Sequence, residues 1–278
     1  MHARDNISDM VNIYHWFYRK VESGSYIITP LGMKLLDRIV DTIHEEFSDW
    51  GNIILPTLQK EDSWKNRIEQ VKDIIFRTDN GLLLAPTNEI YAFKYLQSDK
   101  YSTLRKIYQI HWKYRKEARY NQNMYRTREF LMFDGYSIGT LEQVEKHFNE
   151  AKAKIFNIFS KLNIKVDITN SDPTAMGAEG SSSVEFQADG KELAEIFFLN
   201  KTYTEGDIVT GSYGIGITRI LDYMVQQVIK NGSLPISIFD YATLDIKKYC
   251  HRTSLYINFT SPSMVEGIVA VLNIKDIR

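Results

Sequence analysis

The chain has 278 residues, a formal net charge of −1, 44% hydrophobic residues and 25% charged residues. These values are typical of a soluble globular protein and argue against a generally basic nucleic-acid-binding protein. The single cysteine, Cys250, excludes an internal disulfide and a cysteine-rich zinc site, and it fits a cytoplasmic location. The sequence predicts no signal peptide and no membrane span.

The first half of the chain predicts helices separated by short strands. Leu35, Ile39, Ile43 and Phe47 recur at helical spacing, which predicts a helix over 30–47. The elements that follow are an apolar strand that begins at 51 and ends at Pro56, a strand over 82–84 and a helix over 88–97.

The second half is richer in strands. Thr140 is a typical helix cap and precedes a long amphipathic helix over 140–162. The other predicted elements are strands over 105–117, 126–134, 164–169, 184–188, 194–199 and 209–213, a flexible turn over 177–183 and a helix over 214–230. The sequence thus predicts an α+β fold with a mainly antiparallel sheet flanked by helices. We expect one domain over 1–240 and a short extension over 241–278 packed on it.

Cationic and aromatic residues gather in 114–135, on two predicted strands. Side chains alternate between the two faces of a strand, so pairing these strands would place Arg115, Glu117, Arg126 and Phe130 on one surface. Arginine suits phosphate, a carboxylate can accept from an exocyclic amine, and a phenyl ring can stack on a base. The alternative for each residue alone is a solvated, salt-bridged hairpin.

Two further segments support a nucleotide and amino-acid site. In 211–221, glycines including Gly216 precede a predicted helix that carries Arg219, which suits phosphate, although the glycines could serve only close packing. In 82–90, Thr87 and Glu89 follow a strand. They could hold an ammonium group, or simply cap the next helix.

Ordered segments together resemble the catalytic domain of class II aminoacyl-tRNA synthetases, and specifically that of bacterial-type prolyl-tRNA synthetase. The similarity runs over residues 12–240. The similar segments are ESGSYIITPLGMKLLDRI with NIILPTL, then LLAPTNE, then IYQIHWKYRKEAR with YRTREFLMFDGYS, and then GSYGIGITRIL. The resemblance implies a homodimer formed through the first of these, ATP and Mg²⁺ as cofactors, and adenylation of an amino acid.

The resemblance also implies a role for each matching residue. Arg115 would contact the ATP α-phosphate and the amino-acid carboxylate, Glu117 the adenine amine, and Arg126 the terminal phosphates. Phe130 and Arg219 would stack on the two faces of adenine. Thr87 and Glu89 would hold the amino group, and Arg115 and Arg219 would be the catalytic residues.

The chain departs from the family pattern at three places. It lacks the editing insertion, because VEFQADGKELAEIFFL connects the flanking strands directly. In the expected amino-acid pocket, Val184 stands where the family usually has histidine and Ser212 where it usually has cysteine. No anticodon-binding domain is expected after Pro235, so the acceptor of the activated amino acid could be a tRNA, a carrier protein or a small molecule.

Three functions agree with these features. The first is activation of proline or a similar small amino acid with ATP. The second is a non-catalytic synthetase paralogue that binds an amino acid or a partner and regulates it. The third is a prolyl-tRNA synthetase completed by a separate anticodon-binding chain. The retained nucleotide-binding residues favour the first.

Overall fold

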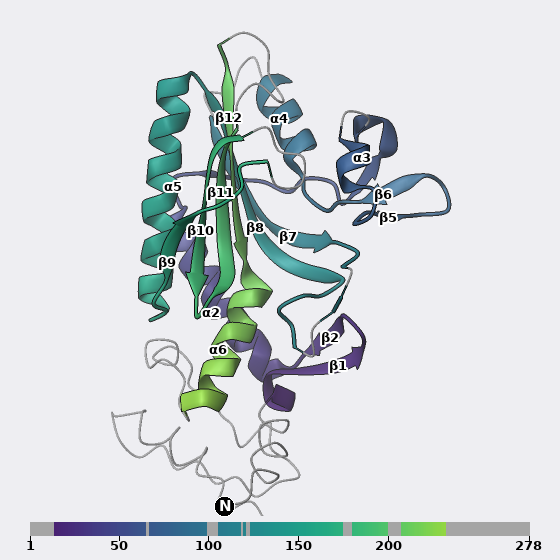
Figure 1. Ribbon diagram of the computed structural model, residues 1–278, viewed down its shortest axis with the longest axis vertical. Helices are drawn as coiled ribbons and strands as arrows, with labels where there is room; N and C mark the ends of the chain where they lie inside the picture. The colour runs from purple at the N-terminus through teal and green to yellow at the C-terminus, as the bar shows by residue number, and fades with distance from the viewer. Residues whose placement is uncertain are drawn as a thin grey trace, which may run out of the picture.

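The computed structural model describes residues 14–64, 67–98, 105–117, 119–120, 123–174, 180–199 and 207–231. The extension expected over 241–278 lies outside these ranges. In the described part a large sheet is covered on one face by long helices, and a smaller sheet and a hairpin project from its side (Figure 1). Among these residues no helix is both long and apolar enough to cross a membrane.

The main sheet has seven strands, in the order β3-β7-β8-β12-β11-β10-β9. All neighbours are antiparallel except β3 and β7. The strands are β3 (Gly51–Asn52), β7 (Lys106–Tyr114), β8 (Glu129–Gly139), β9 (Asp167–Asn170), β10 (Gly180–Ala188), β11 (Lys191–Leu199) and β12 (Val209–Gly216). The predicted antiparallel α+β architecture is confirmed.

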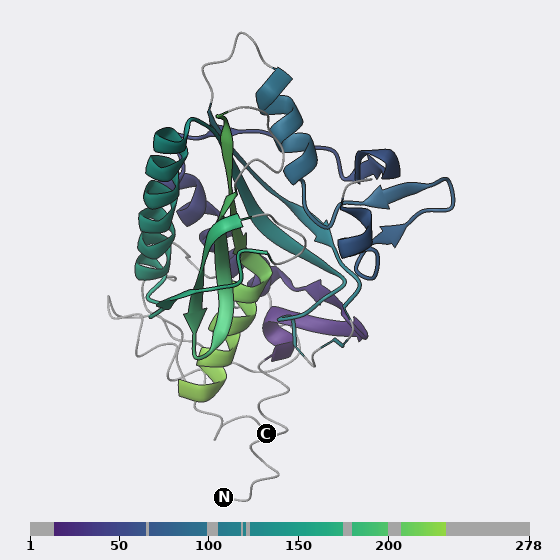
Figure 2. The ribbon, with the colours of Figure 1, turned by 45° about the horizontal axis from the view of Figure 1, so that its top comes forward.

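Three long helices pack against this sheet and one another: α2 (Pro30–Glu46), α5 (Leu141–Lys161) and α6 (Ile217–Asn231). Figure 2 shows α5 and α6 running beside the strands. The hydroxyl of Thr29 accepts from the Gly32 amide and Pro30 occupies the first turn, which explains where α2 begins. Thr140 and Gln143 form a reciprocal capping box at the start of α5.

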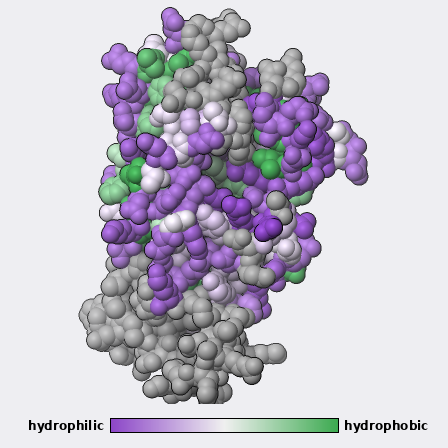
Figure 3. Space-filling model, viewed as in Figure 1, coloured by the Kyte–Doolittle hydropathy of each residue, from purple (hydrophilic) through white to green (hydrophobic). Residues whose placement is uncertain are grey.

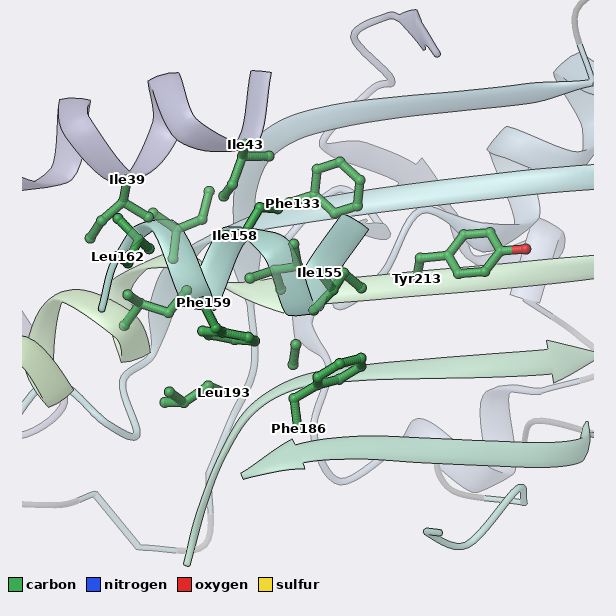
Figure 4. Packing of buried hydrophobic residues seen from close by; sticks show 14 of the residues in the cluster. Ile39, Ile43, Phe133, Ile155, Ile158, Phe159, Leu162, Phe186, Leu193 and Tyr213 are labelled. Carbon is green, nitrogen blue, oxygen red and sulfur yellow. The ribbon is translucent and has the colours of Figure 1, made fainter. Parts of the chain in front are cut away.

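The core lies between these helices and the sheet. Ile39 and Ile43 of α2 face Ile158 of α5, and Phe133 of β8 and Phe186 of β10 lie on the sheet side (Figure 4). All five side chains have no exposed area. Each buried side chain of this size contributes roughly 1.5–3 kcal/mol, so this layer fixes how the helices sit on the sheet.

The smaller parts of the fold flank one edge. They are the hairpin of β1 (Tyr18–Glu22) and β2 (Ser25–Ile28), the sheet of β4 (Leu58–Lys60), β5 (Phe76–Arg77) and β6 (Leu82–Leu84), the short helices η1 (Glu61–Trp64) and α3 (Ile68–Val71), and α4 (Glu89–Ser98). Trp64, Val71, Ile75 and Leu83 form a separate small core there. In the view of Figure 3 the described surface is mostly hydrophilic.

Four boundaries differ from the sequence prediction. The strand predicted to end at Pro56 is shorter in the structure, because β3 ends at Asn52 and residues 53–56 are not in a strand. The strand predicted over 126–134 corresponds to β8, which spans Glu129–Gly139 and so ends five residues later than predicted. The glycines at 214 and 216 lie inside β12, not in a turn, and residues 180–183 belong to β10 although a turn was predicted.

The connection between β10 and β11 is a tight hairpin. Asp189 and Gly190 have φ values of 49° and 71°. Consecutive positive φ values match the right-handed twist of a two-residue hairpin, and glycine adopts them without a steric penalty. No insertion separates these strands, as the sequence predicts.

Candidate active site

A cavity of about 100 Å³ lies on the sheet face opposite the long helices. Side chains alternate along the strands, so Phe133 and Tyr213 point into the core while Asp134 and Ser212 line the cavity. The lining residues are Arg67, Thr87, Glu89, Arg115, Phe130, Met132, Asp134, Glu192, Ala194, Glu195, Phe197, Ser212, Gly214, Gly216 and Arg219. Most of the site residues predicted from sequence are among them.

One end of the cavity is built around the Glu89 carboxylate. Glu89 begins α4, and its amide donates to the hydroxyl of Thr87 at 3.4 Å. The hydroxyl of Ser212, on β12, donates to Glu89 Oε1 at 2.9 Å. The structure therefore brings together three residues predicted to contact the amino acid, although Ser212 is far away in sequence.

Arg67 is a member of this end that the sequence analysis missed. Its guanidinium forms an ion pair with Glu89 Oε2, and both side chains are buried. Arg67 lies just before the short helix α3, in an irregular stretch without periodicity, so no local pattern pointed to it. An isolated buried carboxylate is costly, and this ion pair offsets the burial of Glu89.

The other end of the cavity carries two arginines. Arg115 Nε donates to the Pro86 carbonyl at 3.1 Å, and its guanidinium lies 5.1 Å from the centre of the Phe130 ring. Arg219 Nη1 is 2.7 Å from Glu192 Oε1, and its guanidinium lies 5.0 Å from the centre of the Tyr125 ring. Each cation is therefore oriented by an aromatic ring.

Burial lowers the pKa of Arg115 below its usual value, and the positive charge of Arg219 lowers it further. Two guanidinium groups that repel each other in a buried site would be stabilised by an anion placed between them. Guanidinium groups bind oxyanions, such as a tetrahedral phosphate or a planar carboxylate, through paired N–H donors.

Some predicted residues lie outside the cavity lining. Glu117 is partly exposed, and its negative charge favours the protonated form of Arg115, so its charge reaches the site. Arg126 is exposed and its charge acts on Tyr125. Phe130 and Arg219 do line the cavity, and the sequence analysis placed adenine between them. In the structure Phe130 stacks with Arg115, and Arg219 stacks with Tyr125.

Val184 corrects the sequence analysis. It is only 6% exposed and belongs to the main hydrophobic core, not to the cavity. Its neighbour Ser183 donates to Glu195 Oε1 at 3.1 Å, so the cavity side of β10 carries Ser183 and the opposite side carries Val184. The predicted contact between Val184 and the amino acid is therefore wrong.

Three carboxylates gather on β10 and β11. One oxygen from each of Glu185, Glu192 and Glu195 lies within 4.8 Å of the others. Burial raises the pKa of Glu195 to about 7, and the negative charges of Glu192 and Glu185 add to this effect. Carboxylate oxygens are the donors that hard divalent cations such as Mg²⁺ prefer.

A polar network lies beneath the cavity floor. The fully buried Lys113 ammonium is 2.7 Å from Asp134 Oδ2 and also donates to Asn88 Oδ1. Gln109 donates to the same Asp134 oxygen at 3.3 Å and accepts from the Leu55 amide at 2.9 Å. Because Asn88 lies between Thr87 and Glu89, this network fixes the loop that carries the acidic end of the site.

The fold and this site define a class of protein. A model of the tRNA synthetase class II core domain (G, H, P, S and T) matches residues 75–228, more than half of the chain. The chain belongs to this family, so the resemblance found in the sequence is confirmed.

Similar curated proteins are proline–tRNA ligases. That of Buchnera aphidicola subsp. Schizaphis graminum is 32% identical over 216 residues, which cover 73% of this chain and 38% of that protein. That of Lactobacillus delbrueckii subsp. bulgaricus is 34% identical over 194 residues, covering 65% of this chain and 34% of the relative. The chain thus spans less than half the length of these relatives.

Solved structures agree on the fold. Giardia lamblia prolyl-tRNA synthetase in complex with prolyl-adenylate matches with a TM-score of 0.73 at 18% identity, covering 84% of this chain and 55% of that one. M. kandleri SerRS, in a complex with A. aeolicus tRNASec, matches with a TM-score of 0.70 at 15% identity, covering 83% of this chain and 59% of that one. Both confirm the class II architecture.

Proposed function

We propose that this chain uses ATP to activate proline or a similar small amino acid as an aminoacyl-adenylate. The observation that carries this proposal is the charge separation of the cavity, with Glu89 at one end and Arg115 and Arg219 at the other. A free amino acid has an ammonium and a carboxylate, so it matches such a cavity in charge at both ends. The relatives named proline–tRNA ligase support the same activity.

The residues of the acidic end would bind the amino group. Glu89 is held by Arg67 and by the Ser212 hydroxyl, and Thr87 stands beside it. Arg115 would bind the carboxylate and the α-phosphate. Gly216 leaves the backbone of β12 accessible beside Arg219, where the phosphates and adenine would lie. The roles of Phe130, Glu117 and Arg126 toward ATP rest on the family resemblance.

The proposed reaction is a displacement at phosphorus. A carboxylate oxygen of the amino acid attacks the α-phosphorus of ATP, a new oxygen–phosphorus bond forms, and the bond to pyrophosphate breaks. The carboxylate is already a nucleophile, so no general base is needed. Arg115 and Arg219 would stabilise the negative charge that accumulates on the phosphoryl oxygens, and the cavity would hold the reactants in line.

Mg²⁺ is the proposed cofactor. It is commonly bound by one or two carboxylates together with substrate phosphates. Glu185 and Glu192 offer two such oxygens close together, and Glu192 also pairs with Arg219 at the cationic end. When bound, Mg²⁺ would neutralise phosphate charge. These residues fit the ion by donor type and spacing.

The acceptor, the assembly and the location are proposals of the same kind. Membership of the family favours a tRNA as the acceptor. A carrier protein or a small molecule would accept the aminoacyl group from the same adenylate. A homodimer formed through α2 and the segment after it is supported by Ile54 and Leu58, which are 80% and 50% exposed. A cytoplasmic location is proposed from the single cysteine and the relatives.

Amino-acid-dependent exchange of pyrophosphate into ATP tests the activity directly. We expect exchange with proline or another small amino acid in the presence of Mg²⁺, and its loss on chelation. Aminoacylation of tRNA by the same preparation would identify the acceptor. Binding of ATP without exchange across all amino acids would contradict the activity and favour the non-catalytic paralogue.

A further inference from the structure

Glu195 lines the cavity but has no role in the proposed activation chemistry. It lies on β11 among the residues around the cavity. Ser171 and Ser183 both donate to its Oε1, at 2.8 Å and 3.1 Å, and their hydroxyls are 2.5 Å apart. Two hydroxyls thus fix one oxygen of the carboxylate, and the described residues form no ion pair with Glu195.

The register of β11 and β12 places Glu195 beside the amino-acid end. Glu195 is paired with Gly214, and Phe197 with Ser212, the residue that contacts Glu89. Diagonal neighbours in such a pair lie roughly 7–8 Å apart. Glu195 and Ser212 are such neighbours and Ser212 contacts Glu89, so a small molecule beside Ser212 would lie near both carboxylates.

Gly214 lies between these groups and is covered by the side chain of Met132. A Cβ at this position would come within 2.4 Å of the Met132 methyl group. Met132, Phe197 and Ala194 form apolar walls around the opening. The cavity around Glu195 is therefore partly apolar, and it also carries the Asp134 carboxylate, which is paired with Lys113.

Resting on the proposed function, we propose that the amino acid selected by this chain carries a hydrogen-bond donor on its side chain, a hydroxyl or an ammonium, which the Glu195 carboxylate accepts. A carboxylate oxygen that faces only C–H groups loses hydration without compensation. Sites built to bind a donor discriminate strongly against analogues that lack it, because the buried polar group is then left unpaired.

Unsubstituted proline meets this requirement poorly. Its only nitrogen is the amino group that Glu89 would hold, and the remainder of its ring presents C–H groups to Glu195. The neighbouring carboxylates do not remove the requirement, because Mg²⁺ with phosphates needs only one or two protein carboxylates and Glu185 and Glu192 supply them. Glu195 is then free to contact the amino acid.

The test compares amino acids of matched shape in pyrophosphate exchange. The pairs are threonine with valine, 4-hydroxyproline with proline, and 2,4-diaminobutyrate with 2-aminobutyrate. For at least one pair, we expect kcat/KM of the wild-type protein to be at least about tenfold higher for the member with the donor. Glu195→Leu should remove that preference. The control Glu145→Leu, at an exposed position of α5, should retain it.

Glu195→Gln is a second variant, which keeps the shape of the side chain in case Glu195→Leu does not fold. The amide retains an acceptor oxygen but has no charge, so it should keep a preference for hydroxyl and lose one for ammonium. Two results together would overturn this inference and leave the proposed activation intact. Exchange would be as fast with proline and valine as with their hydroxylated counterparts, and Glu195→Leu would not change these rates. Absence of exchange and of binding with every amino acid would overturn both.

Discussion

Arg219 has two partners at the cavity, the Glu192 carboxylate and the Tyr125 ring. These contacts hold the guanidinium at the cationic end before any substrate arrives. A preorganised cation stabilises transition-state charge more effectively than one that must reorient. The residue therefore connects the geometry of the structure with the rate of the proposed reaction.

Arg219→Ala should lower kcat/KM for pyrophosphate exchange by about 30-fold or more, which corresponds to about 2 kcal/mol of transition-state stabilisation. The measurement is steady-state exchange at varied ATP concentrations. Arg105→Ala removes an exposed arginine outside the cavity and should leave the rate unchanged. Equal rates in both variants would contradict the assignment of Arg219.

Asp222 is a buried carboxylate away from the cavity. Tyr18 donates to its Oδ1 at 2.6 Å, and the Met124 amide donates to the same oxygen at 3.2 Å. Burial nevertheless raises the pKa of Asp222 to about 6, because desolvation of the charge outweighs these hydrogen bonds. A carboxyl with a raised pKa in the folded state binds its proton more tightly there than in the unfolded chain.

The contribution of Asp222 to the free energy of unfolding should therefore increase as pH falls from above 6 to below 4, by about 3 kcal/mol in total. Asp222→Asn removes this dependence and keeps an acceptor for Tyr18. Urea unfolding should show that the free energy of unfolding of the variant, relative to that of the wild type, is higher at pH 7 than at pH 4.5. The control Asp37→Asn, at an exposed position of α2, should show no such change with pH. If the difference in unfolding free energy between Asp222→Asn and wild type were the same at pH 7 and pH 4.5, this account would be wrong.

Helices with strong sequence signals were predicted almost to the residue. The capping residues Thr29 and Thr140 and the spacing of apolar residues act within a few turns, so α2 and α5 follow from local sequence. The strand predicted to end at Pro56 ends at Asn52 in the structure, because the length of this edge strand depends on its pairing with β7. Strand pairing is a contact between distant segments and has no local signature.

The start of α5 offers a test at this scale. Thr140→Ala removes the hydroxyl that accepts from the Gln143 amide and should lower the free energy of unfolding by about 1 kcal/mol. Chemical denaturation measures this value. Ser160→Ala, exposed in the last turn of the same helix, is the matched control and should have a smaller effect. An equal loss from both would show that the capping box adds no stability.

At the scale of the whole molecule, the side chains of Ile54, just after β3, and Leu58, at the start of β4, stand out because they are exposed. Exposed apolar side chains close together are typical of an interface between proteins. The same region resembles the dimer segment of the class II family. A second copy of this chain is therefore the proposed partner.

Ile54→Glu should convert the protein from dimer to monomer at micromolar concentration, because a charge would have to be buried in the apolar interface. Sedimentation velocity measures the change. Leu141→Glu, which adds the same charge at another exposed leucine, should remain dimeric. A wild-type protein that sediments as a monomer at high concentration would contradict the proposed interface.

The sequence by itself determined the family, the class II fold, the main helices and about half of the cavity residues. Their signals are short motifs and periodic patterns that can be read within one segment. Only the tertiary structure decided that Arg67 pairs with Glu89, that Ser171 and Ser183 orient Glu195, and that Val184 points into the core. These facts depend on strand register and on contacts between segments far apart in the chain, and a change of one residue in register reverses the face that each side chain occupies.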